Sequence, residues 1–155
     1  MMPSTAIVDA GALLASLDDR DANHRGSAAV LGRRDLQFVV PALVVAEVAY
    51  LANRRRGPMI EARFVRALHR FEVEGPTPDE WPAIADLVER YANFPIGTTD
   101  AATIVLADRY ETDLIVTLDR RHFSAVQSPK GRRFRLLPDQ VAVHEEPAIY
   151  EPTAP

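Results

Sequence analysis

Four acidic side chains are the residues of this sequence whose type and placement could do chemistry. Asp9 follows the apolar run "TAIV" and Asp119 follows "LIVTL", so each acid comes at the end of a predicted buried strand. Asp100 opens the run "DAATIVLA", and Glu47 lies inside "LVVAEVAYL" amid apolar residues. Carboxylates that are brought close together repel, so they must take up protons or bind a cation. Their oxygens suit Mg²⁺ or Mn²⁺, which bind through few carboxylates plus waters and substrate phosphate.

Each acid also has a structural explanation of its own. Asp9 and Asp100 stand at the starts of helical stretches, where an aspartate caps a helix or stabilises its dipole. Asp119 could likewise cap a short helix over residues 120–123. Glu47 could face water on a narrow polar stripe of its helix. The set of four, rather than any single member, favours a cation site.

Several other kinds of site are excluded or disfavoured. The sequence has no cysteine, which excludes a disulfide framework, a thiolate metal site and a cysteine nucleophile. None of the histidines has a second histidine at metal-ligand spacing, which argues against zinc. They are His24, His69, His122 and His144. The one lysine, Lys130, lies in the loop-like "SPKG", unlike the pocket lysine of a receiver domain, and "DAG" replaces the Asp-x-Asp of haloacid dehalogenase phosphatases.

The elements that must position the acids alternate along the chain. Apolar runs predict strands at residues 5–9, 36–41, 71–74, 113–117 and 132–138. Helical periodicity predicts helices within residues 10–19, 21–34, 42–57, 58–68, 78–94 and 98–110. The residues of helix 78–94 that we expect to face inward are Trp81, Ile84, Leu87, Val88 and Tyr91. This alternation predicts an α/β domain with a parallel sheet.

A parallel sheet would bring two of the acids together. Right-handed crossovers place the carboxyl ends of all parallel strands at one edge, where such sheets bind their ligands. Asp9 and Asp119 each follow a predicted strand. We therefore expect two distant segments of the chain to deliver an acid to the same edge.

Length and charge limit the class of protein. The 155 residues suit one domain, which we place at residues 1–138. Residues 139–155 hold four acids and no base and are rich in proline, so we expect a mostly disordered tail. The other 18 acids balance the 18 basic residues, so the body is neutral despite the net charge of −4. Without a signal peptide or an apolar run near the ~20 residues of a membrane helix, we expect a cytoplasmic protein.

Four motifs in this order resemble a known family. They are "IVDAGALLA", "PALVVAEVAYL", "TTDAATIVLADRY" and "VTLDRRHF", and their acids are spaced 38, 53 and 19 positions apart. This pattern resembles the four acidic motifs of the PIN-domain nucleases, and most closely the VapC-type toxins of bacterial toxin–antitoxin pairs. The resemblance covers about residues 5–137. Any one motif is weak, but four in order with strands in the right places are specific.

The resemblance implies a fold, an activity and partners. The implied fold is a three-layer α/β/α domain with a central parallel sheet in the order 3-2-1-4-5. The implied activity is Mg²⁺- or Mn²⁺-dependent cleavage of RNA, inhibited by a cognate antitoxin, usually in a homodimer. Asp9, Glu47, Asp100 and Asp119 match the acidic residues of the family, and Thr117 matches a hydroxyl that supports the site. Ala10 departs from the Ser or Thr that many relatives carry after the first aspartate.

The chemistry of phosphodiester cleavage suggests a role for each residue. We assign Asp9 and Asp100 as direct metal ligands, whereas Glu47 and Asp119 hold metal-bound waters or ligate a second ion. Arg120 and Arg121 lie beside Asp119 and are the best phosphate contacts, unless they are only solvated surface charges. The competing hypothesis is a PIN-fold module that binds RNA or serves as a scaffold without turnover. DNA cleavage, the RNA target and the number of metal ions stay open.

Overall fold

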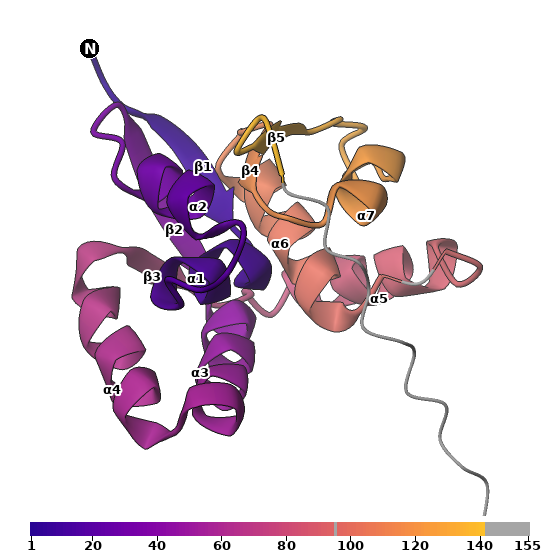
Figure 1. Cartoon of the computed structure of the whole chain (residues 1–155). Coiled ribbons are helices and arrows are strands. Elements are labelled where there is room, and N and C mark those ends of the chain that lie inside the picture. Colours follow the sequence, from indigo (N-terminus) through magenta and orange to yellow (C-terminus); the bar gives the residue numbers. More distant parts are fainter. Residues whose placement is uncertain (95, 142–155) are drawn as a thin grey trace, which may run out of the picture.

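The computed structural model describes residues 1–94 and 96–141, and its centre is one parallel sheet (Figure 1). The five strands lie in the order β3-β2-β1-β4-β5, and every neighbouring pair is parallel. Their bounds are β1 Ser4–Val8, β2 Leu36–Pro41, β3 Glu72–Glu74, β4 Leu114–Val116 and β5 Arg135–Leu137. The predicted α/β class and the sheet order 3-2-1-4-5 are therefore confirmed.

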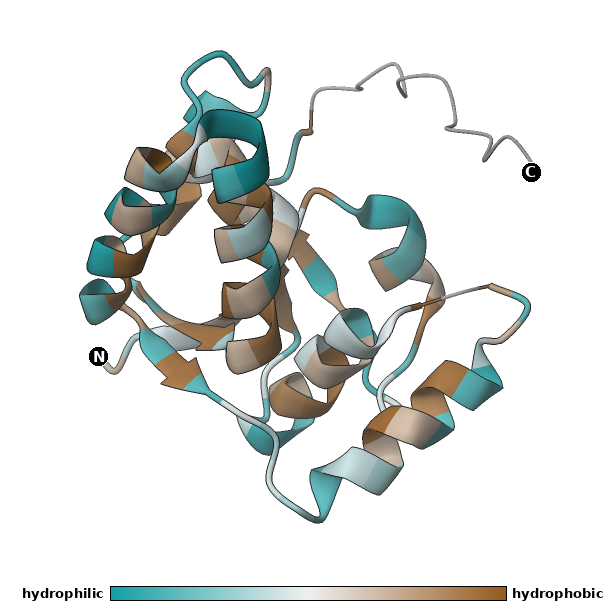
Figure 2. Ribbon diagram, turned by 90° about the horizontal axis from the view of Figure 1, so that it is seen from below, coloured by the Kyte–Doolittle hydropathy of each residue, from teal (hydrophilic) through white to brown (hydrophobic). Residues whose placement is uncertain are grey.

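Helices cover both faces of this sheet and make the three layers (Figure 1). One layer holds α1 Ala10–Leu17, α2 His24–Leu31, α3 Ala42–Arg56, α4 Pro58–Ala67 and a short 3₁₀ turn at Leu68–Arg70. The other holds α5 Glu80–Arg90, α6 Thr98–Arg109 and α7 Arg120–Ala125. Figure 2 shows mainly hydrophobic strands between helices whose surfaces alternate between hydrophobic and hydrophilic residues. Within the described part of the chain, every helix is too short or too polar to cross a membrane.

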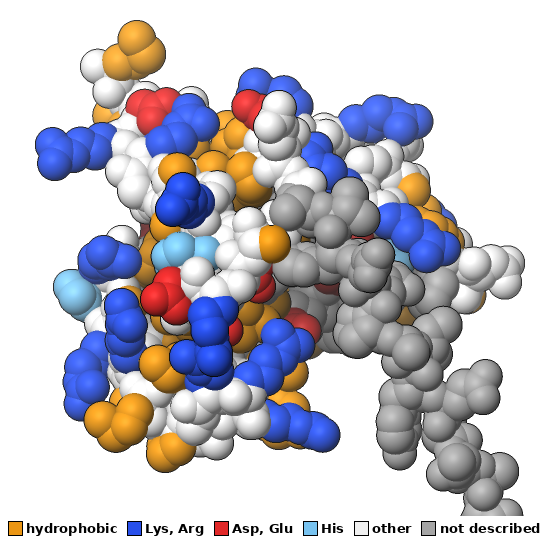
Figure 3. All heavy atoms as spheres, viewed as in Figure 1, with side chains coloured by type: hydrophobic (Ala, Val, Ile, Leu, Met, Phe, Trp, Pro, Cys, Tyr) orange, Lys and Arg blue, Asp and Glu red, His pale blue; other side chains and the backbone are white. Residues whose placement is uncertain are grey.

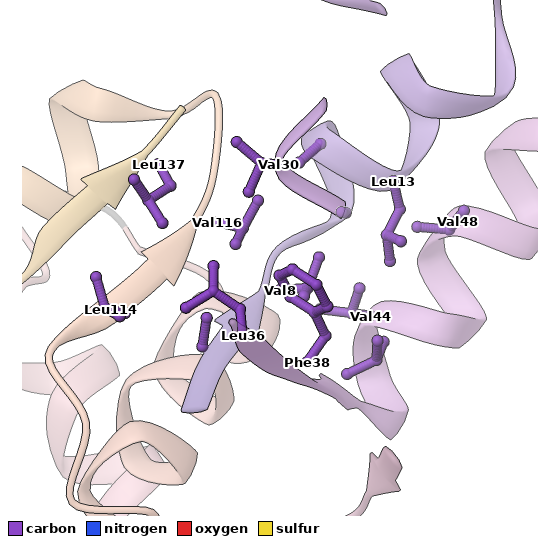
Figure 4. Packing of buried hydrophobic residues seen from close by; sticks show 14 of the residues in the cluster. Val8, Leu13, Val30, Leu36, Phe38, Val44, Val48, Leu114, Val116 and Leu137 are labelled. Atoms are coloured by element: carbon purple, nitrogen blue, oxygen red, sulfur yellow. The ribbon is translucent and has the colours of Figure 1, made fainter. Parts of the chain in front are cut away.

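Alternating strand residues build a separate core on each face of the sheet. Val8, Phe38 and Val116 face the α1–α4 layer and pack with apolar residues of α1, α2, α3 and α4 (Figure 4). Their neighbours Ile7 and Ile115 face the opposite way, toward α6. Because the strands are buried on both faces, they read in the sequence as continuous apolar runs. The pairing of β1 with both β2 and β4 holds the segment that ends at Asp9 in the middle of the sheet.

The structure corrects some sequence-based expectations. Trp81, predicted to face inward, is 46% exposed, whereas Ile84 and Leu87 of the same helix are buried. Trp81 lies in the first turn of α5, and an apolar residue at a helix end can point past the surface on which the helix packs. The last strand is shorter than expected. The tail predicted for residues 139–155 lies outside the described residues from position 142 onward.

Candidate active site

Asp9 leaves the end of β1 and enters the carboxyl edge of the sheet. Its backbone N–H donates to the carbonyl of Val116 at 2.9 Å, which continues the pairing of β1 with β4 by one residue. Asp9 stands at the N-cap position of α1, but its side chain makes no capping hydrogen bond. The capping explanation is therefore wrong for Asp9. Its carboxylate instead accepts a hydrogen bond from the hydroxyl of Thr117 at 2.8 Å.

Thr117 joins the two strand ends through a single hydroxyl. The residue is fully buried and its backbone N–H donates to the carbonyl of Leu137 at 2.8 Å, so its position is set by the sheet. Its Oγ1 donates to Asp9 and accepts from the backbone N–H of Asp119 at 3.0 Å. The predicted supporting hydroxyl thus contacts one acid directly and holds the backbone of another.

Asp119 has both of the roles that its sequence context suggested. It is the N-cap of α7, where its Oδ1 accepts from the backbone N–H of His122 at 3.0 Å. Its Oδ2 lies 2.6 Å from Nδ1 of the same histidine. The capping explanation is correct here, yet the charge of Asp119 also acts on Asp100. In the sequence His122 stands apart from the other histidines, and its spacing of three from Asp119 is the signal for this contact.

Asp100 lies in the first turn of α6, where a carboxylate also stabilises the helix dipole. The side chain is half-buried, and burial together with the negative charge of Asp119 raises its pKa. Glu47 is exposed on α3, in agreement with the view that it faces water. Nevertheless, partial desolvation and the charge of Asp100 raise the pKa of Glu47 as well.

Asp9 is the most strongly perturbed of the four acids. It is only 6% exposed, and burial is the main reason that its pKa rises from 3.8 to about 7. The charges of Asp100 and, to a smaller extent, Glu47 raise it further, against hydrogen bonds from the Ala10 backbone and the Thr117 hydroxyl. Electrostatic coupling therefore connects all four predicted acids, and Asp100 takes part in the coupling with each of the others.

This donor set fits a divalent cation that prefers oxygen. Within residues 1–94 and 96–141, no three aspartate, glutamate or histidine side chains already stand as one metal-binding group. Mg²⁺ and Mn²⁺ do not require such a group, because one or two carboxylates suffice when waters and a phosphate complete the coordination. A cation would also favour the charged forms of acids whose pKa values are raised by burial and by mutual repulsion.

The two predicted phosphate contacts lie in different environments. Arg120 is half-buried and donates a hydrogen bond to the carbonyl of Pro138. Arg121 is exposed, and its Cζ lies 5.7 Å from the centre of the Phe94 ring. Phe94 is expected at the end of the helix predicted for residues 78–94, whereas α5 ends at Arg90 and Phe94 lies in the loop beyond it. On the face shown in Figure 3, some acidic side chains lie near the centre and others near the top, and basic side chains lie at many points around them.

Comparisons with known proteins agree with this geometry. The PIN domain family model matches residues 6–128. Ribonuclease VapC26 of Mycobacterium tuberculosis is 39% identical over 134 residues, 85% of this chain and 99% of that protein. The crystal structure of Mycobacterium tuberculosis VapC20, described as a sarcin–ricin loop cleaving toxin, has a TM-score of 0.66 at 19% identity and covers 72% of this chain and 87% of that one. A toxin–antitoxin complex from Klebsiella pneumoniae has a TM-score of 0.63 at 19% identity, covering 78% and 92%.

The two solved structures are too distant in sequence to show more than the fold. The family match and the relative at 39% identity both span most of the chain. The family match, at residues 6–128, includes the strand end at Asp9 and the helix that carries Asp100, where the structure places the coupled acids. On this evidence the chain belongs to the PIN-domain family.

Proposed function

We propose that this protein is a metal-dependent endoribonuclease that acts as the toxin of a toxin–antitoxin pair. The observation that carries the proposal is the coupled acidic cluster at the carboxyl edge of the sheet, with Asp9 buried at its centre. A relative with 39% identity is named a ribonuclease, which supports RNA as the substrate. In this proposal residues 1–138 form the nuclease domain of a cytoplasmic protein, which pairs as a homodimer.

The proposed metal is Mg²⁺ or Mn²⁺, held directly by Asp9 and Asp100. Glu47 and Asp119 hold waters around it or ligate a second ion. A divalent ion in this position supplies activation of a water as nucleophile and neutralisation of charge on the scissile phosphate. All four side chains offer only oxygen, which is the donor type that these ions prefer.

The other polar residues of the site position the acids. The Thr117 hydroxyl fixes the orientation of the Asp9 carboxylate, and it holds the start of the turn that carries Asp119. His122 fixes the Asp119 carboxylate through two hydrogen-bonding atoms. Arg121 is exposed and can reach a phosphate, whereas Arg120 keeps unused guanidinium donors beyond its bond to Pro138.

The alternative from another class is a PIN-fold module that binds RNA or acts as a scaffold without cleaving it. Loss of turnover would relax the need for four carboxylates, yet all four are present, and burial and neighbouring acids raise the pKa values of Asp9, Glu47 and Asp100. The set therefore favours an active nuclease. Cleavage of DNA in place of RNA is the closer variant, and parallel assays with matched oligonucleotides separate the two.

Metal dependence is the direct test of the proposed function. We expect the purified protein to cleave single-stranded or looped RNA in Mg²⁺ or Mn²⁺ and to stop in EDTA. Zinc should not replace either ion, because no two histidines of the sequence stand at metal-ligand spacing and it has no cysteine to supply a thiolate. Cleavage products separated on a denaturing gel provide the measurement. Activity that persists through exhaustive chelation would falsify the metal mechanism, whereas RNA binding without cleavage would favour the scaffold alternative.

The antitoxin belongs to the same proposal. Known structures with this fold include VapBC from Salmonella typhimurium, at 17% identity with a TM-score of 0.63. A groove of about 230 Å³ runs between α1, α2 and α4, with Leu17, Leu31 and Phe64 in its walls and Arg63 and Arg70 beside them. Residues of α1 line this groove, whereas α3 supplies none of its described lining. Its apolar walls and basic rim suit an amphipathic, acidic segment.

Co-expression with the adjacent small gene tests this partner. We expect a complex that survives purification and relieves growth arrest by the toxin. Leu31→Glu should weaken the complex at least tenfold in a pull-down titration, because it places a charge against an apolar segment. Val65→Glu, on the exposed side of α4, is the control and should bind normally. Equal binding by both variants would place the antitoxin elsewhere.

A further inference from the structure

An aromatic and cationic cluster lies outside the four acids but next to them. The rings of Phe94 and His122 are 5.1 Å apart and nearly perpendicular, at 72°. The guanidinium carbon of Arg121 lies over the Phe94 ring at 5.7 Å from its centre. The three side chains come from two segments, the loop that leads into α6 and the first turns of α7.

The cluster is fixed to the acidic site through His122. One side of the imidazole meets Phe94, and its Nδ1 lies 2.6 Å from the Asp119 carboxylate. The charges of both Asp119 and His122 act on Asp100. In the sequence Phe94 also lies six positions before Asp100, which stands in the first turn of α6. A group bound on the Phe94 ring would therefore be a close neighbour of a phosphate at the acids.

The fold does not explain why an aromatic ring stands here. Phe94 is half-buried and belongs to none of the three apolar clusters formed by the described residues. Arg121 is exposed and has no ion pair with any acid in the described part of the chain. Binding of phosphate alone would use Arg121, but it would give no role to the neutral ring.

We propose that Phe94, His122 and Arg121 form a stacking site for one nucleobase of the RNA, next to the scissile phosphate. Unpaired RNA bases stack on aromatic rings and on guanidinium planes, and every base has a π face that allows this. The base takes the face of Phe94 over which Arg121 lies, and the flexible arginine moves to the outer face of the base or to its phosphate. His122 keeps the ring in place because Asp119 fixes its orientation.

This site deepens the proposed function and rests on it. It assigns single-stranded or looped RNA as the substrate, because a paired base keeps its faces stacked in the helix. It also assigns the loop at residue 94 a direct part in positioning the scissile bond, in addition to the phosphate contacts of the arginines. A ring that accepts any base predicts weak base preference at this position and strong dependence on the presence of a base.

Removing the aromatic ring while keeping apolar bulk is the test. We expect Phe94→Leu to lower kcat/KM on an unstructured RNA about tenfold or more, mainly through KM, whereas Phe94→Trp stays near wild type. An RNA with an abasic residue at the stacked position should lower the kcat/KM of wild type by a similar factor. The same RNA should leave the kcat/KM of Phe94→Leu almost unchanged. Equal losses for both proteins on every abasic substrate would overturn the proposal, as would full activity of Phe94→Leu.

The chain offers a matched control in Phe71. Its ring makes the same two kinds of contact, with the Phe38 ring at 6.3 Å and the Arg70 guanidinium at 5.9 Å. It precedes the lateral edge strand β3 and packs on the α1–α4 core, whereas Asp9 and Asp119 follow the inner strands β1 and β4. Phe71→Leu should therefore keep kcat/KM and lose stability. A loss of kcat/KM equal to that of Phe94→Leu would show that the effect is structural.

A binding measurement separates this proposal from the proposed function. The Asp100→Asn protein, in which cleavage is blocked, is titrated into RNA oligonucleotides with 2-aminopurine at successive positions. We expect fluorescence quenching at one position, and its loss in the Asp100→Asn, Phe94→Leu double variant. If wild type does not cleave RNA but this quenching occurs, the nuclease function fails and the stacking site stands. If wild type cleaves RNA and no position depends on Phe94, the stacking site fails alone.

Discussion

Asp100→Asn is expected to lower the rate of RNA cleavage by about a hundredfold or more while the protein stays folded. Asparagine keeps the size and shape of the side chain but removes the negative charge. A site that holds its ion through few carboxylates loses most of its affinity when one of them becomes neutral. Asp9→Asn should have an effect of the same size, because Asp9 is the other proposed direct ligand.

Asp100 is the more informative of the two positions, because its charge is coupled to each of the other acids. Removing it should lower the pKa values of Asp9 and Glu47, both of which it raises. A purely structural role predicts a different result. Asparagine caps a helix about as well as aspartate, so a helix cap at this position would survive the change with activity and stability intact.

Asp86→Asn is the matched control for this prediction. Asp86 is exposed on α5, and the substitution makes the same change of charge away from the coupled acids. The turnover of Asp86→Asn at saturating Mg²⁺ should remain within about twofold of wild type. Circular dichroism checks that each variant is folded. If Asp100→Asn and Asp9→Asn cleaved RNA as fast as this control, the four acids would have to be explained as separate structural residues.

The sequence predicts the parts of this site that depend on strand ends. Apolar runs followed by an acid place Asp9 and the Thr117–Asp119 turn at one edge once the sheet is parallel. Periodicity alone does not determine the strand order, and the order 3-2-1-4-5 came from the resemblance of the motifs. Given that order, β1 and β4 are neighbours, and the Thr117–Asp9 hydrogen bond across 108 positions follows.

The parts that sequence analysis missed depend on side-chain direction. Nothing in the sequence shows that Arg120 turns to the Pro138 carbonyl while Arg121 turns to Phe94. The two arginines are adjacent and chemically identical, so only the packing of α7 distinguishes them. The exposed position of Trp81 is a similar case, because hydrophobic periodicity does not say where the surface beneath a helix ends.

The stability of the metal-free protein should fall as pH rises from about 4 to about 7, and Asp9 should be the main cause. In the unfolded chain the carboxyl has its ordinary pKa of 3.8, whereas in the folded protein the pKa is about 7. Below both pKa values the carboxyl is protonated in the folded and the unfolded state, so it does not lower the free energy of unfolding. Between them only the folded state keeps the proton, so the free energy of unfolding decreases with pH, and above pH 7 the loss is complete.

The expected size of this effect is large. At 1.36 kcal/mol for each pH unit between the two pKa values, the loss approaches about 4 kcal/mol, which for a domain of this length is on the order of 10 °C in Tm. Burial of Asp9 justifies the use of the full difference, since little solvent reaches the carboxyl. The raised pKa values of Glu47 and Asp100 also make stability fall as pH rises. Arginines lower the pKa values of Glu80 and Asp113, so these two acids make stability rise with pH.

The comparison of wild type with Asp9→Asn isolates the contribution of Asp9 from these other groups. Near pH 4 the protonated acid and the amide are both neutral, so the two proteins should unfold at nearly the same temperature in EDTA. At pH 8 the variant should be the more stable, because wild type then holds a buried charge beside Asp100. Mg²⁺ at pH 8 should raise the Tm of wild type and leave the variant nearly unchanged, since a cation offsets the charge that only wild type carries. A Tm difference that stays constant from pH 4 to pH 8, with equal responses to Mg²⁺, would mean that Asp9 is neither the perturbed acid nor a metal ligand.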